Sequence, residues 1–322
     1  MSGIVVLAET RRGELRPVTL ELIGAARTLS EQGAGPVTVA LIGADADAHV
    51  AAVGLAGVQD VLVVPSPQPQ FEAHVTQAAV EALIEQRRPT LVLAGHTIDS
   101  LGFAPAVAAR GSHGFASDVT EASWGEQGAL VQRGAYGGKL IAELDFPGKQ
   151  TVVLLLRAGA FAPADAAETG GGTAVERVEL KLDGTGRTEH LELRDPPAGD
   201  VDITKADFLL SIGRGVGAAE NLPPLERLAG AIGATLSVSG ALVEAGMAPR
   251  TRKVGLTGAT VAPRVYLALG ISGAAQHLAG MSRSSTIIAV NTDPAARIFD
   301  IAHYGAVADL FEIAAELERL SA

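Results

Sequence analysis

The sequence predicts an α/β protein with two domains, each a mostly parallel β-sheet with flanking helices in a Rossmann-like arrangement. Three observations predict this fold class. The 322 residues exceed the ~100–200 residues of a usual domain. Short continuous apolar runs alternate with segments of helical spacing, as in sheets covered on both faces. This pattern stops in a stretch rich in proline, glycine and acidic residues and then restarts. We therefore expect domains over residues 1–195 and 206–322, with a linker over 196–205.

The N-terminal domain is predicted from strand-like and helix-like segments in alternation. Apolar runs of strand length occur in GIVVLAE, PVTVALIG, DVLVVPS and TLVLAG, and helical spacing occurs over residues 17–32 and about 72–85. The helix after TLVLAG is expected to start at an N-cap formed by Asp99 or Ser100. Further strands are predicted in SDVTEASW, ALVQRGAYGGKLIAELDF and KQTVVLLLRAGAF. Apolar and charged residues alternate in AVERVELKL and TEHLELRD, which predicts half-buried strands.

The C-terminal domain repeats the pattern from FLLSIG onward. A helix follows whose apolar face carries Leu225, Leu228, Ala229 and Ile232, and Gly233 is expected to end it. The segments ATLSVSGAL, RVYLALGISG and STIIAVNTD supply further strands, and VADLFEIAAEL supplies a terminal helix. The two domains share an architecture but no sequence period.

Composition excludes several classes of function. The formal net charge of −11 gives no general attraction to nucleic acid or anionic membranes, so neither nucleic-acid binding nor direct membrane insertion is expected. The absence of cysteine removes disulfides, iron–sulfur clusters and thiolate metal sites. None of the seven histidines has metal-ligand spacing, so no metal site is expected. The short apolar run at the N-terminus precedes its arginines, which is the wrong order for a secretory signal, so we expect a cytoplasmic protein.

Four polar turns follow predicted strands of the C-terminal domain, namely IGRGVG, SVSG, GISGAAQH and VNTD. Ligands of open parallel sheets bind beyond the carboxyl ends of the strands. Glycines in such turns allow backbone N–H groups to approach phosphate oxygens, and Arg214 is a candidate phosphate partner. Each turn alone is a weak signal, but the four together indicate a nucleotide-type cofactor.

One histidine, His277, lies near the start of a helix beside the glycine turn of GISGAAQH. That position suits a hydrogen-bond donor aimed at a ligand carbonyl or a developing anion.

Other chemistries fit the sequence poorly. It lacks the G-x-S-x-G elbow and the lysine-containing end of a P-loop, and IGRGVG lacks the full G-x-G-x-x-G spacing of a pyridine-nucleotide dehydrogenase.

Several long motifs resemble the α subunit of electron transfer flavoprotein. GISGAAQHLAGM, followed by STIIAVNTDPAARIFDIAHYGAVADLF, carries the closest resemblance, and IGRGVGAAEN, VGLTGATVAPRVYLALGISGA, AYGGK and LLRAGAF also match. The resemblance covers most of the chain and is strongest over residues 206–312. It implies an electron carrier, rather than a substrate-converting enzyme, whose C-terminal domain binds FAD.

The resemblance also implies partners. The α subunit forms a heterodimer with a β subunit that binds AMP, or a second FAD where the complex bifurcates electrons. The heterodimer takes electrons from flavoprotein dehydrogenases and passes them to a quinone-linked oxidoreductase or another acceptor. Whether this member bifurcates electrons or relays them simply is left open by the sequence.

The resemblance further assigns cofactor contacts by position. Arg214 matches the arginine of the family's GRG turn, and Thr257 would approach the flavin N5 side. His277 would reach the flavin O2 carbonyl, where a donor stabilises the negative charge of the reduced ring. Three further residues, Asn291, Asp309 and Leu310, match contacts on the adenosine side. The expected cofactor-binding residues are Arg214, Ser239, Val254, Gly255, Leu256, Thr257, Ser272, Gly273, Ala274, Ala275, Gln276, His277, Asn291, Asp309 and Leu310.

Two positions depart from the family pattern. Gly240 stands where the family has an arginine over the flavin, and Leu256 replaces a glutamine. Loss of a nearby cation should make the flavin harder to reduce. Arg250, Arg252 and Lys253 are candidates to compensate for it. An alternative interpretation is a nucleotide-binding scaffold or regulatory module derived from this family, with altered or lost redox activity.

Overall fold

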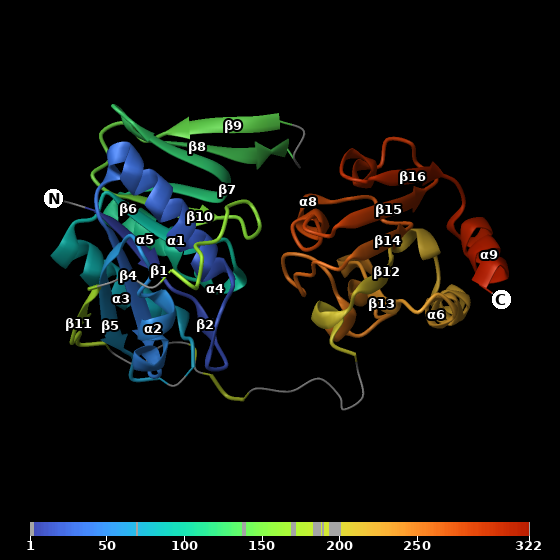
Figure 1. Ribbon diagram of the computed structural model, residues 1–322, viewed down its shortest axis with the longest axis horizontal. Helices are drawn as coiled ribbons and strands as arrows, with labels where there is room; N and C mark the ends of the chain where they lie inside the picture. Colours follow the sequence, from blue (N-terminus) through green and yellow to red (C-terminus); the bar gives the residue numbers. More distant parts are fainter. Residues whose placement is uncertain are drawn as a thin grey trace. The chain divides into compact units, whose positions relative to one another are not determined.

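The structure, a computed structural model, describes residues 3–68, 70–136, 140–168, 172–182, 188, 190–192 and 201–321. The chain divides into two compact units, Met1–Glu192 and Leu193–Ala322 (Figure 1). Of the segment predicted as a linker, residues 196–200 lie outside the described residues. Ile203, in the same predicted segment, is buried in the C-terminal core.

The N-terminal unit contains a nine-stranded sheet in the order β11-β5-β4-β1-β6-β10-β7-β8-β9. Neighbouring strands are parallel from β11 to β7, and β8 and β9 continue the sheet antiparallel. The prediction of a mostly parallel sheet is therefore confirmed. The strands are β1 (Ile4–Leu7), β4 (Val37–Gly43), β5 (Val58–Pro65), β6 (Leu91–Gly95), β7 (Gly114–Gly125), β8 (Gly128–Ala135), β9 (Leu140–Asp145), β10 (Val152–Leu156) and β11 (Ala174–Arg177).

Helices cover both faces of this sheet, which explains its continuous apolar strands. Ile4 and Val6 of β1 pack in one core cluster with Leu22, while Val5 and Leu7 of the same strand pack in the opposite cluster. Alternate side chains of a strand point to opposite faces, so a strand buried on both sides has no polar face. The helices are α1 (Val18–Leu29), α2 (Val50–Val53), α3 (Ala73–Arg87), α4 (Ile98–Leu101) and α5 (Ala104–Gly111).

Two local predictions for this unit are wrong. Helix α4 is capped by Thr97, whose hydroxyl accepts from the amide of Ser100, rather than by Asp99 or Ser100, because the helix begins two or three residues earlier than expected. The described residues of TEHLELRD form no strand, and Leu191 is 83% exposed. Alternation of apolar and charged residues predicts a strand only where one face finds a core, and here it does not.

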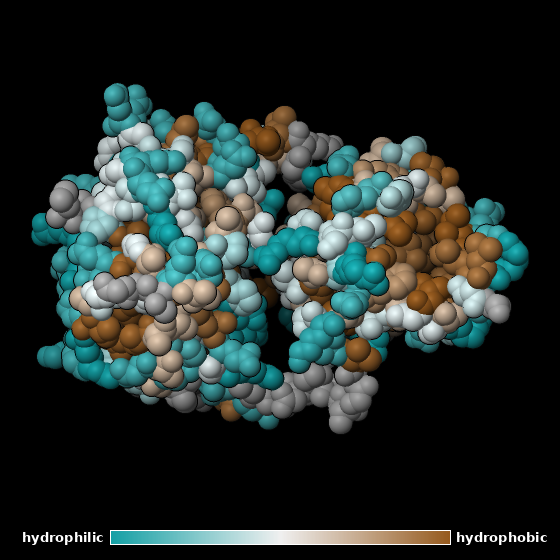
Figure 2. Space-filling model, viewed as in Figure 1, coloured by the Kyte–Doolittle hydropathy of each residue, from teal (hydrophilic) through white to brown (hydrophobic). Residues whose placement is uncertain are grey.

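The antiparallel edge of the sheet carries exposed apolar side chains. Tyr136 follows β8, and Leu140 and Ile141 begin β9; all three are more than half exposed. Figure 2 shows apolar surface at this end of the hairpin. Exposed apolar residues on an edge strand favour association with another surface.

The C-terminal unit contains a five-stranded, all-parallel sheet in the order β13-β12-β14-β15-β16 (Figure 1). One face packs with α6, where Leu225 and Leu228 are fully buried as predicted. On the opposite face, the strands pack with residues before and after β14, including Val254 and Met281. The elements are β12 (Phe208–Ile212), α6 (Leu222–Ala231), β13 (Thr235–Val238), α7 (Gly240–Glu244), β14 (Val265–Leu269), α8 (Ala275–Leu278), β15 (Thr286–Asn291), β16 (Tyr304–Val307) and α9 (Leu310–Ser321).

No helix among the described residues is both long and apolar enough to span a bilayer.

Candidate functional site

The carboxyl ends of the C-terminal strands bring predicted site residues to one edge of the sheet. Ser239 follows β13, Arg214 follows β12, Ser272 follows β14, Asn291 ends β15 and Asp309 follows β16. Because all neighbouring strands are parallel, these residues succeed one another along the edge in strand order. The chain reverses its direction of travel across the sheet between β12 and β14. Such a switch point is where open α/β sheets bind ligands.

Glycines pack the turns after β12 and β14 directly against each other. A Cβ on Gly213 would lie 2.2 Å from the carbonyl oxygen of Gly270, and a Cβ on Gly270 would lie 2.9 Å from Cα of Gly215. The amide of Gly215 donates to the Gly270 oxygen at 3.0 Å, and Gly270 has φ +66°. The two turns therefore form one backbone surface at the switch point, which no larger residue would permit.

The turn after β14 leaves three successive amides without acceptors. Among the described residues, none accepts from the backbone N–H of Ser272, Gly273 or Ala274. Asn291 fixes this turn because its Nδ2 donates to the Ile271 oxygen at 2.8 Å, and the Ser272 oxygen accepts from Ile298. Unused amides held in a fixed turn form an anion-binding concavity.

The loop containing Gly255, Leu256 and Thr257 is joined to α8. The amide of Leu256 donates to the oxygen of Gln276 at 2.7 Å, and a Cβ on Gly280 would lie 2.5 Å from Cα of Gly255. Thr257 and Gln276 remain exposed, while Leu256 is half-buried. Two segments that are twenty residues apart in the sequence therefore form one wall of the site.

A cation occupies the space beside Gly240. A Cβ on Gly240 would lie 3.0 Å from Cε and 3.2 Å from Nζ of Lys253. The Lys253 side chain is only 15% exposed, and its Nζ lies 3.7 Å from Oε1 of Glu244. Of the three cations named as candidates to compensate for the absent arginine, Lys253 is therefore the one beside Gly240. Ser239, the preceding residue, makes no capping hydrogen bond with its hydroxyl.

His277 is buried within the unit, with 6% of its surface exposed. Its Nε2 lies 2.9 Å from the hydroxyl of Tyr266, a fully buried residue of β14 that sequence reasoning missed. Its buried Nδ1 makes no well-formed hydrogen bond with the described residues. Burial lowers the pKa of His277 to about 4, although the Val254 backbone opposes this shift. The imidazole is therefore neutral at neutral pH.

The remaining predicted residues divide into exposed and supporting positions. Arg214 is exposed and makes no ion pair with a described residue; Ala274 is also exposed. Oδ1 of Asp309 accepts from the amide of Phe311 and so caps α9. Leu310 is buried, and its Cδ2 packs against Gly270. The predicted residues at the ends of β12, β13 and β14 thus line the edge, whereas Leu310 acts within the core.

The corresponding edge of the N-terminal sheet is closed by paired polar side chains. Thr97, after β6, donates to Glu9, after β1, at 2.9 Å. Burial raises the pKa of Glu9, with the Thr97 hydrogen bond opposing it. Arg157 binds both carboxylate oxygens of Asp118 at 2.7 Å. His96 is buried close to Asp118, and burial lowers its pKa.

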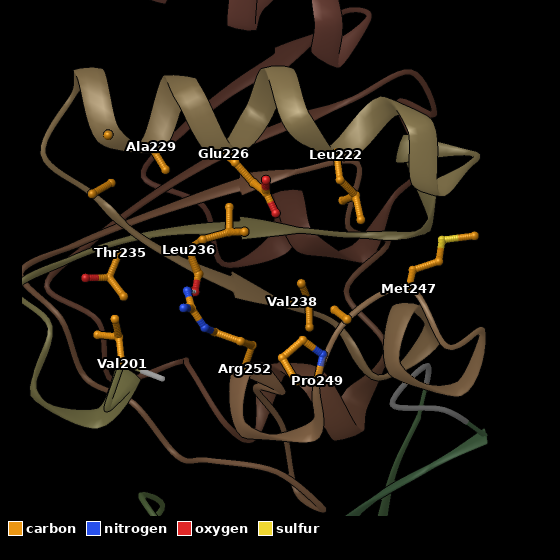
Figure 3. A pocket seen from close by; sticks show the side chains of 13 residues that line it. Val201, Leu222, Glu226, Ala229, Thr235, Leu236, Val238, Met247, Pro249 and Arg252 are labelled. Atoms are coloured by element: carbon orange, nitrogen blue, oxygen red, sulfur yellow. Dashed lines mark hydrogen bonds between the residues drawn. The ribbon is translucent and has the colours of Figure 1, made fainter. Parts of the chain in front are cut away.

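A pocket of about 430 Å³ lies beside β13 and α6 of the C-terminal unit (Figure 3). None of the predicted site residues lines it. Arg252 crosses its wall and donates to the Leu236 oxygen at 3.0 Å, which covers the open side of edge strand β13. Its lining is mostly apolar, and it explains none of the sequence motifs. Within the described residues, no three His, Asp or Glu side chains form a metal site.

The missed residue Tyr266 left a signal in the sequence. The strands in FLLSIG, TLSV and VYLAL place hydroxyl-bearing side chains next to apolar ones, at Ser211, Ser237 and Tyr266. Buried hydroxyls need partners, so polar residues in buried strands indicate a network. The contact between Tyr266 and His277 could not be predicted, because the two residues lie on different elements of the fold.

Both units match known families. Residues 4–183 match the electron transfer flavoprotein domain, and residues 202–282 match the electron transfer flavoprotein FAD-binding domain. The second match includes the predicted residues from Arg214 to His277 and ends before Asn291.

Curated proteins show the same similarity over nearly the full chain. The electron transfer flavoprotein subunit alpha of Methylophilus methylotrophus is 44% identical, covering 99% of this chain and 98% of that protein. The protein of the same name from Thermoanaerobacterium thermosaccharolyticum is 34% identical, covering 96% and 94%. The lactate dehydrogenase (NAD(+),ferredoxin) subunit LctC of Acetobacterium woodii is 36% identical, covering 98% of this chain and 76% of that protein.

Proposed function

The chain belongs to the electron transfer flavoprotein α-subunit family, and on this premise we propose that it binds FAD in its C-terminal unit as one subunit of a heterodimer. Membership gives it an electron-transfer role and a β-subunit partner. We further propose that flavoprotein dehydrogenases donate its electrons and that a quinone-linked oxidoreductase or another acceptor receives them. Bound FAD would supply reversible electron transfer, and the protein would hold and tune it.

The observation that carries this proposal is the turn after β14. It presents the unused amides of Ser272, Gly273 and Ala274 at the switch point, beside the exposed Arg214. Amides and a guanidinium are the groups that bind phosphate oxygens. The glycine contacts keep side chains out of this space, so an extended dinucleotide fits the residues present.

The two ends of the cofactor would meet different groups. Thr257 and His277 lie along one wall with Leu256 and are proposed to face the flavin. Asp309 is proposed to lie toward the adenosine. Asn291 acts indirectly, because Nδ2 is bonded to Ile271 and Oδ1 accepts from the amide of Asp293. It would keep the amides of the β14 turn in place rather than contact the ligand.

The test is coexpression with the β subunit, followed by extraction and quantification of flavin and by a reductive titration of the visible spectrum. One FAD per heterodimer that is reduced and reoxidised supports a simple relay. Two FAD per heterodimer would favour electron bifurcation, with the second flavin in the β subunit. A complex that lacks flavin after reconstitution with FAD would contradict the proposal.

The alternative of a scaffold without redox activity rests on Gly240 and Leu256. The position of Lys253 argues against it, because an ammonium group already stands beside Gly240. A positive charge therefore remains available next to Ser239.

A further inference from the structure

Four buried polar side chains, Ser211, Ser237, Tyr266 and His277, lie on one face of the C-terminal sheet. Ser237 of β13 pairs in register with Ser211 of β12, and Ser211 with Ala268 of β14. Tyr266 is two residues before Ala268 on β14, so its side chain lies on the same sheet face as both serines. His277 of α8 covers this face and meets the Tyr266 hydroxyl. Ser211, Ser237 and Tyr266 have no measurable exposure.

Burial keeps Tyr266 and His277 uncharged. The pKa of Tyr266 is raised by burial, and the nearby Ser211 and Ser237 hydroxyls oppose the shift, so the phenol keeps its proton at neutral pH. The imidazole of His277 is neutral for the same physical reason. A neutral imidazole has one donor nitrogen and one acceptor nitrogen. The contact of 2.9 Å between the phenol and Nε2 therefore has two possible proton arrangements.

In the first arrangement, Tyr266 donates to Nε2. The phenol oxygen is then free to accept from Ser211 and Ser237, whose hydroxyls have no other partner among the described residues. The second nitrogen, Nδ1, carries the remaining proton; the Val254 backbone raises the pKa of the ring, but Nδ1 makes no well-formed hydrogen bond with it. The N–H of Val254 already donates to Val238, so the group that Val254 can offer the ring is its carbonyl. The hydroxyl protons of the two serines and of Tyr266, and the Nδ1 proton of His277, then each have an acceptor nearby.

In the second arrangement, Nε2 would donate to the phenol. Tyr266 would then donate to one serine, and Nδ1 would turn a lone pair toward the Val254 carbonyl, with no donor available to it. A buried acceptor without a donor costs free energy. The first arrangement is therefore the more stable.

We infer that Tyr266 is a positioning residue that donates to His277 Nε2 and so fixes the imidazole as the neutral tautomer with its proton on Nδ1. Building on the proposed function, Nε2 is then only an acceptor, and Nδ1–H, which makes no well-formed hydrogen bond with Val254, is the donor that His277 can offer a flavin carbonyl. It also means that His277 brings no positive charge to the site. The cation beside Gly240 is Lys253, on a different segment from His277.

The experiment is a long-range nitrogen–proton correlation spectrum of the histidine side chains in the ¹⁵N-labelled full chain. It is recorded with the β subunit, both without FAD and with FAD. His277 is assigned by comparison with His277→Gln. The expected result is a protonated Nδ1 and an acceptor Nε2 at neutral pH. A protonated Nε2, or a doubly protonated ring, would overturn the inference.

Variants separate positioning from mere packing. Tyr266→Phe removes the donor and should shift the tautomer ratio toward Nε2–H by roughly five-fold, the loss expected for one neutral hydrogen bond. Tyr304→Phe, an exposed tyrosine of the same unit, is the matched control and should change nothing. An unchanged tautomer in a folded Tyr266→Phe protein would contradict the role.

The serines give a second measurement that does not remove the phenol. If Tyr266 donates to His277, Ser211→Ala with Ser237→Ala leaves the tautomer unchanged. If the phenol donated to a serine instead, the double variant would remove its acceptor and the tautomer would change. Failure to bind FAD would refute the proposed function alone, because the nitrogen signals of the flavin-free chain still decide what Tyr266 does.

Discussion

The two units carry the same kind of sheet but treat its carboxyl edge in opposite ways. At the N-terminal switch point, between β1 and β6, Glu9 and Thr97 bind each other. Nearby, Arg157 holds Asp118 with two hydrogen bonds. At the C-terminal switch point the turns contain glycines, and the described amides around Gly273 have no acceptor.

This difference separates a scaffold edge from a binding edge. Polar groups that satisfy one another stabilise the fold and leave nothing for a ligand. Polar groups held in place by other residues, but left without partners, offer their hydrogen bonds to whatever enters. The same topology can thus serve as structure in one unit and as a candidate cofactor site in the other.

The largest effect is expected from Gly213→Val, which tests whether the glycine contact makes the binding edge. The new side chain would meet the Gly270 carbonyl, so the two turns would separate and FAD binding should be lost. Flavin absorbance of the complex with the β subunit measures this. Gly230→Ala is the control, because its Cβ meets nothing within 4 Å; it should raise stability by roughly 0.5–1 kcal/mol.

The N-terminal edge supplies a matched glycine. Gly95→Ala, at the end of β6, would press on the methyl groups of Val18 and should lower stability while FAD is retained. Loss of FAD in this variant, or normal binding in Gly213→Val, would remove the distinction between the two edges.

Acid should weaken the C-terminal unit through His277. The folded pKa, about 4, is below the ordinary value of 6.5. The stabilisation is therefore present above pH 6.5 and is lost as the pH falls toward 4, by roughly 3 kcal/mol in total. Hydrogen exchange of the C-terminal unit across this pH range measures the loss. His277→Gln should make the unit less sensitive to pH, and an equal slope in variant and wild type would contradict the assignment.

The Asp118–Arg157 pair should affect stability but not the flavin. Arg157→Met leaves a half-buried carboxylate without its partner and should cost about 1–3 kcal/mol of unfolding free energy. Denaturant unfolding gives this value, and flavin content should match that of the wild type. Asp118→Asn is the milder companion variant, because asparagine tolerates the positive φ of this position. Loss of FAD in either variant would show that the N-terminal edge also serves the cofactor.

The smallest effect is expected at Lys253. Lys253→Met should lower the midpoint potential of bound FAD by up to about 60 mV, a tenfold change in a one-electron equilibrium. Glu244→Gln should raise the potential slightly because it removes the opposing charge. Spectroelectrochemical titration measures both. Gly240→Arg should add little, since Lys253 already occupies that place, and a large rise would show that Lys253 acts elsewhere.

Much of the architecture was predictable from local patterns. Strands buried on both faces must be continuously apolar, so β1, β4, β5, β6 and β12 are visible as short runs. Helix α6 follows from the spacing of Leu225 and Leu228. The edge on which the turns would gather follows from a parallel sheet. The strand predicted in TEHLELRD failed because alternation alone does not show whether a core is available.

The sequence by itself determined the two α/β units, the glycine turns at the ends of the C-terminal strands and the family resemblance, because each depends on residues close together in the chain. Only the tertiary structure decided which polar groups are satisfied. It placed Lys253 beside Gly240, Tyr266 against His277 and Glu9 against Thr97. These contacts join separate elements, and a hydrogen bond or a charge acts through distance in space, which residue order does not specify.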